Sequence, residues 1–302
     1  MAPAVSVVVV AYDMARELPR TLHTLDPRRQ VGVDGGDYEV VLVDNGSPTP
    51  VDPDVLARFS GRLELIRLDP APPSPARAAN EGVRAASGDL VGLVVDGARL
   101  CSPGLVATAR LAAALASRPV VTAPAWHLGP VPHMRAAEVG YDQAAEDELL
   151  ATTGWEDDAY ELFGVSTFAG SSWRGIFGPM GESSSLFLPP SLWEELGGLD
   201  ERFDLPGGGL VNHDLYRRAT ELPGVRLVEL LGEGTFHQFH GGAATSRRFG
   251  WPEMAAGYEA LRGEPYRPPT ARPLYLGSVP PAYLPHVERS ARLAIDGFPK
   301  PS

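Results

Sequence analysis

The first 123 residues alternate between short apolar runs and helical patterns, and this alternation limits the fold more than any other feature. Strand-like runs lie at 5–11, 39–43, 63–68, 90–95 and 119–123. Helical patterns lie at 14–25, 76–86 and 103–117. Continuous apolar runs are typical of parallel strands buried on both faces, and residues 63–68 alternate as a half-buried strand does. The order predicts right-handed crossovers and a mixed, mostly parallel α/β sheet flanked by helices.

Polar residues follow three of these runs directly. Tyr12 and Asp13 follow the first, Asp44 and Asn45 close the second, and Asp96 follows the fourth. Ligands of such sheets bind outside the carboxyl ends of the strands. We therefore expect the three aspartates to belong to one site.

Bulk properties exclude several classes of partner and compartment. The 302-residue chain has a formal net charge of −12, which argues against binding to nucleic acid or to anionic lipid. A single cysteine, Cys101, favours a reducing compartment. The amino terminus has no signal-peptide pattern, and no apolar run approaches the ~20 residues of a membrane span. We expect a cytoplasmic protein without a transmembrane segment.

The second half of the chain is less regular. Acidic runs at 146–148 and 156–158 are expected on solvated surfaces, and the Gly-, Ser- and aromatic-rich stretch 164–185 resembles a binding loop. Helices are expected at 191–196 and around 214–219, and a strand at 226–231. After residue 264 the chain is rich in proline. We expect the tail 265–302 to wrap the domain or to mediate association, with a homodimer as one form.

Four stretches, in this order, carry a family resemblance. They are Val5–Asp13, Val41-Leu42-Val43-Asp44-Asn45-Gly46-Ser47, Ala76–Asp96, and Glu195-Leu196-Gly197-Gly198-Leu199-Asp200-Glu201-Arg202-Phe203. Over residues 4–242 the chain resembles family-two glycosyltransferases of the GT-A fold, a Rossmann-like fold of nucleotide-diphospho-sugar transferases. The resemblance implies a GT-A domain over 1–264, with a nucleotide-binding half (1–123) and an acceptor-binding half (124–264).

The residues expected at the nucleotide sugar lie at the strand ends and on the helix after the third strand. They are Ala11, Tyr12, Asp13, Asp44, Asn45, Arg77, Asn80, Asp96, Gly97 and Arg99. Trp173, in the Gly/Ser-rich stretch, and Asp200, in the fourth motif, are expected near the sugar or the acceptor. The alternative for Asp13 and Asp44 is that they cap turns, and for a large aromatic that it belongs to the core.

A metal site is expected at Asp96, His240 and His237. The family has Asp-x-Asp after its fourth strand, whereas this chain has Asp96-Gly97-Ala98 and lacks the second carboxylate. A late histidine can complete the metal shell in relatives, so His240, with His237 as its partner, is expected to bind Mn²⁺ or Mg²⁺ together with the diphosphate. Imidazole suits Mn²⁺ better than Mg²⁺. The alternative is that a histidine bonds to the backbone of a Gly-rich loop.

Asp214 is the candidate general base, and Glu182 is the reserve candidate. Transfer with inversion needs a carboxylate that takes the proton of the acceptor hydroxyl. The family often has Glu-Asp at this place, whereas this chain has Asn212-His213-Asp214. The alternative for Asp214 is a purely structural role near a helix N-terminus.

The resemblance to family-two glycosyltransferases implies a hexosyltransferase. It would move a hexose, with inversion and metal assistance, from a UDP- or dTDP-sugar to a hydroxyl of a glycan, a lipid-linked intermediate or a small molecule. One alternative is a catalytically degenerate protein that only binds nucleotide sugars. A nucleotidyltransferase is a weaker alternative, because residues 11–14 lack a Gly-rich loop and a basic residue.

Overall fold

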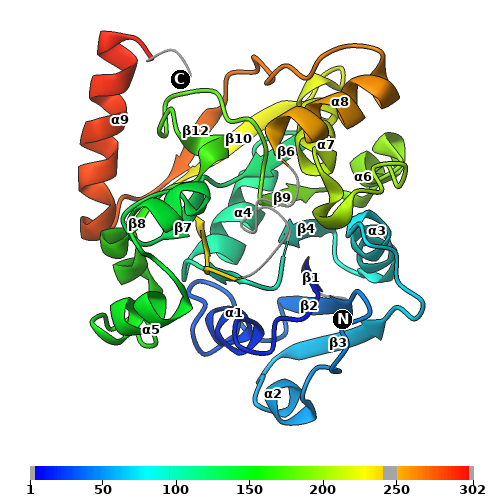
Figure 1. The fold of residues 1–302 in the computed structure, drawn as a ribbon, viewed down its shortest axis with the longest axis vertical. Helices are drawn as coiled ribbons and strands as arrows, with labels where there is room; N and C mark the ends of the chain where they lie inside the picture. Colours follow the sequence, from blue (N-terminus) through cyan, green and yellow to red (C-terminus); the bar gives the residue numbers. More distant parts are fainter. Residues whose placement is uncertain (1–3, 95, 241–249, 299–302) are drawn as a thin grey trace.

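Eight strands form one central sheet in the computed structural model, which describes residues 4–94, 96–240 and 250–298 (Figure 1). The strand order is β12-β10-β6-β9-β4-β1-β2-β3. The bounds are β1 Val5–Ala11, β2 Tyr38–Asp44, β3 Arg62–Arg67, β4 Leu90–Val94, β6 Pro119–Thr122, β9 Ser185–Leu188, β10 Arg226–Leu231 and β12 Leu274–Gly277. Strand β9 runs antiparallel to β4 and β6, and the other pairs are parallel. The predicted mixed, mostly parallel sheet is confirmed.

Helices cover both faces of this sheet. Their bounds are α1 Leu18–Thr24, α2 Pro53–Ala57, α3 Ala76–Ala85, α4 Leu105–Ala113, α5 Gln143–Ala151, α6 Pro190–Leu196, α7 Val211–Glu221, α8 Trp251–Arg262 and α9 Leu284–Asp296. In strand β1, Val8 and Val10 pack with α3, α6 and α7, whereas Val7 and Val9 pack with α1 and α4. Successive side chains of a strand point to opposite faces, so one apolar run supplies both cores.

A smaller sheet lies beside the central one and continues from the chain that leaves β4. Its order is β5-β11-β7-β8, with bounds Arg99–Cys101, Thr235–His237, Ala125–Leu128 and Ser166–Phe168. Strand β11 pairs with β5 so that His237 lies opposite Arg99, and it pairs with β7 so that His237 lies opposite His127. This small sheet therefore brings β5, β7 and β11, which are distant from one another in the sequence, together near the end of β4.

Two expectations about elements need correction. Helix α1 begins at Leu18 rather than near residue 14, because residues 12–17 form turns with Asp13 at a φ of 53°. Strand β3 is the outer strand of the sheet and is mostly exposed, with Leu65 at 41%. It lacks a covering layer because only the short helix α2 precedes it.

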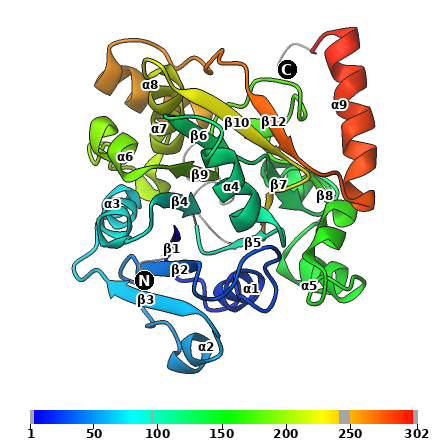
Figure 2. The same ribbon diagram turned by 180° about the vertical axis from the view of Figure 1, so that it is seen from behind.

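The proline-rich tail contributes to both sheets. Strand β12 extends the central sheet by pairing in parallel with β10, and the fully buried Tyr283 joins the aromatic core of the small sheet. Helix α9 then runs along the side of the molecule opposite α3, as both views show (Figures 1 and 2). None of the helices within the described ranges is long and apolar enough to cross a membrane.

Glu233 is a buried carboxyl between the two sheets, 3% exposed. Tyr160 donates to its Oε1 at 2.8 Å, and Ser102 Oγ lies 2.5 Å from its Oε2. Burial raises the pKa of Glu233 to about 7, although these hydrogen bonds oppose the rise. The unfolded chain loses this proton near the ordinary pKa of a glutamate, whereas the folded protein keeps it until the pH reaches the raised pKa. The free energy of unfolding therefore falls as the pH rises between these two pKa values.

We expect Glu233→Gln to become more stable relative to the wild type as the pH rises from about 5 to about 8. The difference in unfolding free energy should grow by up to about 3 kcal/mol over this range, because the amide cannot ionise. Urea unfolding of both proteins at the two pH values measures it. A difference that does not change with pH would contradict the raised pKa.

Candidate functional site

The ends of β1, β2 and β4 bring the sequence-predicted aspartates to one edge of the sheet. Asn45 donates its backbone N–H to the carbonyl of Ala11 at 2.8 Å, and Asp13 donates its backbone N–H to Ser47 Oγ at 2.9 Å. A Cβ added to Gly97 would lie 3.0 Å from Cβ of Ala11, so the turn after β4 packs directly against the end of β1. These three turns form one continuous surface.

Asp44 is held by the chain itself. It is 1% exposed, its Oδ1 accepts from the backbone N–H of Ser47, and its Oδ2 accepts from Arg67 at 2.7 Å. The neighbouring Asn45 differs: its Nδ2 donates to the carbonyl of Pro72, but its buried Oδ1 has no hydrogen-bond partner among the described residues. A buried acceptor without a donor is costly, so Asn45 Oδ1 is the atom here that is best placed to accept from a ligand.

Asp96 lies at the centre of the site, where β4 ends. Its Oδ1 accepts from the backbone N–H of Ala98, and its Oδ2 lies 3.3 Å from Arg99 Nε and 3.4 Å from His237 Nε2. Burial alone would raise the pKa of Asp96, but Arg99 and the histidines outweigh it and hold the pKa well below its usual range. The carboxylate is therefore ionised in the folded protein.

Arg99 is the cation that accompanies Asp96. It lies on β5, is 9% exposed, and its buried Nε and Nη1 have no hydrogen-bond partner among the described residues. Guanidinium groups recognise carboxylates and phosphates through paired N–H bonds. Arg99 is thus available to an anion that enters beside Asp96.

His237 and His240 converge on Asp96, although they flank a strand end. His237 is the last residue of β11, and its Nε2 lies 3.1 Å from Nε2 of His240. The ligand atoms of both histidines and of Asp96 all lie within 4.8 Å of one another. Burial, together with the nearby His237, lowers the pKa of His240 to about 4, so the imidazole is neutral near pH 7.

This donor set fits a divalent cation. Two nitrogens bound to one ion at about 2.1 Å and at nearly a right angle lie about 3 Å apart, close to the distance between His237 and His240. A carboxylate and two neutral imidazoles suit Mn²⁺ or Zn²⁺ better than Mg²⁺. Ala98, which stands where the family has its second aspartate, is fully buried, and its carbonyl accepts from the N–H of Gln238.

Two further histidines stand behind His237, and sequence analysis missed them. His133 Nδ1 lies 3.2 Å from His237 Nδ1, and the His133 ring stacks on that of His127 with centroids 4.3 Å apart. Burial, together with neighbouring histidines, lowers the pKa of both rings, that of His133 to about 3. No motif connects His127 and His133 to His237, so the pairing of β7 with β11 was needed to find them.

Helix α5 holds the segment that carries His240, which corrects the expectation for the acidic run 146–148. Glu146 is fully buried, and its Oε2 accepts from the backbone N–H of Phe239 at 2.6 Å. Arg16 donates to the carbonyl of Phe239 and to Glu146 Oε1, so both the backbone N–H and the backbone carbonyl of Phe239 are hydrogen-bonded. Both views place α5 beside α1 (Figures 1 and 2). Asp147 lies on the surface and pairs with Arg16 and Arg20.

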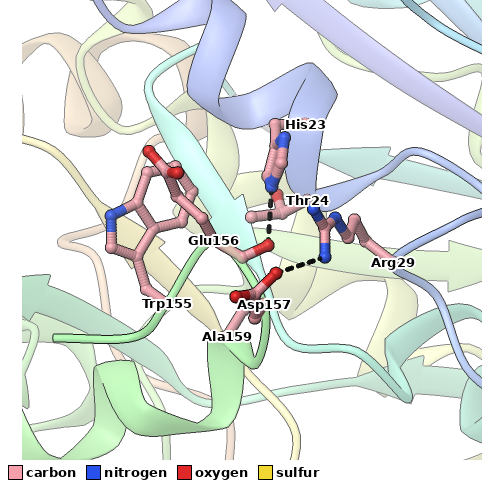
Figure 3. Close-up of a pocket in the computed structure, with 7 residues that line it drawn as sticks. All are labelled: His23, Thr24, Arg29, Trp155, Glu156, Asp157 and Ala159. Atoms are coloured by element: carbon pink, nitrogen blue, oxygen red, sulfur yellow. Dashed lines mark hydrogen bonds and ion pairs between the residues drawn. The ribbon is translucent and has the colours of Figure 1, made fainter.

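The second acidic run, 156–158, closes a small pocket between α1 and the segment after α5 (Figure 3). His23 Nε2 donates to the carbonyl of Glu156 at 2.8 Å, and Arg29 donates to Asp157 at 3.0 Å. The polar groups of this pocket thus pair with one another. Its lining contains no member of the Asp96 cluster, so it joins α1 to the chain and does not form part of the site.

Glu182 lies close to the end of β4. Ser185 pairs with Val94, so the residues before Ser185 run past the turn that contains Asp96. The Glu182 side chain is 26% exposed, and its Oε2 lies 3.3 Å from Nδ1 of His213, the third residue of α7. This carboxylate is accessible to a substrate.

Asp214, the first candidate for the general base, is instead saturated by arginines. It is 1% exposed, and both of its oxygens accept from Arg262, while Oδ2 also accepts from Arg218. Arg218 also donates hydrogen bonds to the backbone carbonyls of Leu196 and Gly198. Asp214 therefore joins α6, α7 and α8, and this geometry disfavours it as a proton acceptor.

The remaining predicted residues lie around this region. Asp200 pairs with Arg202 and Arg262, and the buried Asn80 of α3 bonds to the backbone of Leu199. Arg77 is exposed on α3. Trp173 is half-buried with Arg174 stacked over its ring at 4.6 Å. Asn80 thus holds the fourth family motif against α3. That Asp200, Asn80, Arg77 and Trp173 contact a substrate remains a prediction.

A family model described as Glycosyl transferase family 2 matches residues 6–121. The resemblance to family-two glycosyltransferases is confirmed over this stretch. It contains strands β2 to β5 and most of β1 and β6, and with them Asp13, Asp44 and Asp96 of the site. A comparison with curated proteins finds no match to the chain.

Solved structures show the same fold, and the chain has the GT-A fold. S. aureus TarS 1-349 in complex with UDP-GlcNAc matches with a TM-score of 0.56 and 14% identity, over 87% of this chain and 65% of that one. The mannosyltransferase PcManGT from Pyrobaculum calidifontis, in complex with GDP-Man and Mn²⁺, matches with a TM-score of 0.50 and 17% identity, over 99% and 77%. This chain spans 60 to 65% of the TarS 1-349 chains it matches.

We expect Asp214→Asn to lower the free energy of unfolding by about 3 kcal/mol, because removing one partner of a buried ion pair leaves the other charge uncompensated. Asp204→Asn, an exposed aspartate, is the matched control and should change stability by less than about 0.5 kcal/mol. Urea unfolding measures both. Wild-type stability in Asp214→Asn would contradict the structural role of Asp214.

Proposed function

We propose that this protein is an inverting glycosyltransferase that moves a hexose from a nucleoside diphosphate sugar to an acceptor hydroxyl, with a divalent cation bound at Asp96, His237 and His240. The observation that carries the proposal is the convergence of these three side chains at the carboxyl end of β4, at the edge where sheets of this type bind ligands. Two solved proteins of the same fold contain a nucleotide sugar, and one of them also contains Mn²⁺.

The donor would occupy the edge formed by the ends of β1, β2 and β4. Asn45, with its unpaired Oδ1, would face the nucleoside, together with Asp13 and Tyr12 at the end of β1. Arg99 would face the diphosphate and offset the charge that develops on the leaving group. A cation at Asp96 would supply further positive charge to the same oxygens.

Glu182 is the proposed general base, in place of Asp214. Its carboxylate is partly exposed and close to the end of β4, whereas both oxygens of Asp214 bind arginines. A carboxylate that receives the proton of the attacking hydroxyl must reach that hydroxyl. His213 would orient Glu182 from the first turn of α7.

We expect UDP, dTDP or GDP to bind the protein in the presence of Mn²⁺ and to bind much more weakly in the presence of a chelator. His240→Ala should weaken binding by more than the roughly 10–100-fold that loss of an outer-shell partner costs, because it removes a direct ligand. His23→Ala, on α1, is the matched control. Titration calorimetry measures the affinities.

Equal binding with the chelator would contradict the metal site and leave charge neutralisation to Arg99. Binding of none of the three nucleotides would contradict the proposed donor class. Binding without release of nucleoside diphosphate from any donor sugar would favour the nucleotide-sugar-binding alternative, which the absence of the second family carboxylate motivates.

We expect Glu182→Gln to lower kcat for nucleoside diphosphate release by roughly 100- to 10,000-fold, the range typical of a general base. Its affinity for the nucleotide should remain that of the wild type, since Glu182 contacts the acceptor side. Glu194→Gln, on the exposed face of α6, is the matched control. Wild-type turnover in Glu182→Gln, measured with water or a screened alcohol as acceptor, would contradict this role.

A further inference from the structure

A chain of ring nitrogens begins at a backbone carbonyl and ends at the Asp96 cluster. His133 Nε2 lies 3.0 Å from the carbonyl oxygen of Leu128. A carbonyl only accepts hydrogen bonds, so Nε2 of His133 carries the hydrogen. In the neutral ring the other nitrogen, Nδ1, is then an acceptor.

The acceptor nitrogen of His133 determines which ring nitrogen of His237 carries a hydrogen. Their Nδ1 atoms lie 3.2 Å apart, so His237 Nδ1 carries the hydrogen that His133 accepts. In the Nδ1–H tautomer of His237 the lone pair is on Nε2, and this is the nitrogen that lies 3.4 Å from Asp96 Oδ2 and 3.1 Å from His240 Nε2. The lone pair of His237 and the carboxylate of Asp96 thus face one another, which is the arrangement that a cation stabilises.

The group His127, His133 and His237 also has ligand atoms within 4.8 Å of one another, but its geometry does not suit a second metal. His127 Nδ1 already accepts from the backbone N–H of His133 at 2.8 Å. The rings of His127 and His133 are stacked at an interplanar angle of 22°, so their in-plane lone pairs do not converge on one ion. Hydrogen bonding explains this group better than metal binding.

We propose that His133 is a positioning residue that holds His237 as the Nδ1–H tautomer and thereby directs Nε2 of His237 toward the cation site. The proposal rests on the proposed function in one respect, that His237 binds a metal. Outer-shell partners of this kind fix the tautomer and orientation of a metal-binding imidazole. His133 is 3% exposed and His237 is 7% exposed, so water does not compete for the bond between them.

The tautomer is tested on the metal-free protein by imidazole ¹⁵N NMR near neutral pH, with the His237 signals assigned from a His237→Asn variant. We expect Nδ1 of His237 to carry a hydrogen. A ring without a hydrogen on Nδ1 would overturn the proposal. This measurement needs neither metal nor activity.

The consequence for metal binding is tested with Mn²⁺ alone, by titration calorimetry. His133→Leu removes the acceptor and should weaken Mn²⁺ binding by roughly 10–100-fold, with His237 moving to the Nε2–H form in the NMR spectrum. His133→Asn, whose side-chain carbonyl lies near the position of Nδ1, should restore both properties.

Wild-type affinity and tautomer in His133→Leu would overturn the proposal. If His133→Leu does not fold, the wild-type NMR spectrum decides. If the wild type itself binds no Mn²⁺, the metal part of the proposed function fails, whereas the tautomer measurement still tests the role of His133.

Discussion

The burial of β1 on both faces is the constraint on which the rest of the structure depends. A strand without a solvated face carries a polar side chain only where that side chain is hydrogen-bonded, as Ser6 of β1 is to Glu39 of β2. The other carboxylates and amides at β1, β2 and β4 lie at the carboxyl ends of the strands or in the turns that follow. Parallel strands place these turns at one edge. Asp13, Asp44, Asn45 and Asp96 gather there as a consequence of how the core is built.

The gathering of carboxylates in a chain of net charge −12 requires local cations. Arg99 accompanies Asp96, Arg67 accompanies Asp44, and Arg262 is shared by Asp200 and Asp214. Arg16 does the same for Glu146 on α5 and also holds the peptide that precedes His240. These arginines differ in their contacts, because Arg99 keeps buried N–H groups without a hydrogen-bond partner among the described residues whereas Arg262 uses its N–H groups for two carboxylates. The first is suited to binding an anion, and the second is suited to holding helices together.

The strands of the central sheet in the first 123 residues, and helix α3, were predictable because each depends on local pattern, whereas α2 and β5 were not predicted. Strand β1 matches its predicted bounds, and β2, β3, β4, α3 and β6 lie within two residues of theirs. The site was predictable where a residue follows such an element, as Asp96 does. It was not predictable for Asp214, whose arginine partners come from the same helix and from α8, 48 residues later in the chain. Glu146 was misplaced for the same reason, since its acidic neighbours indicate a solvated surface and its partner Phe239 lies 93 residues away.

The sequence by itself determined the fold class, the edge of the sheet that carries the site and the family that the first part of the chain resembles. Periodicity and turn residues are local properties, and they are sufficient for these conclusions. Only the tertiary structure decided which ionisable groups pair with each other. Pairing depends on distances between atoms from different segments, such as the contact of His133 on the segment after β7 with His237 on β11. The sequence does not distinguish the two neutral tautomers of a histidine. For His133, the hydrogen bond to the carbonyl of Leu128 determines which ring nitrogen carries the hydrogen.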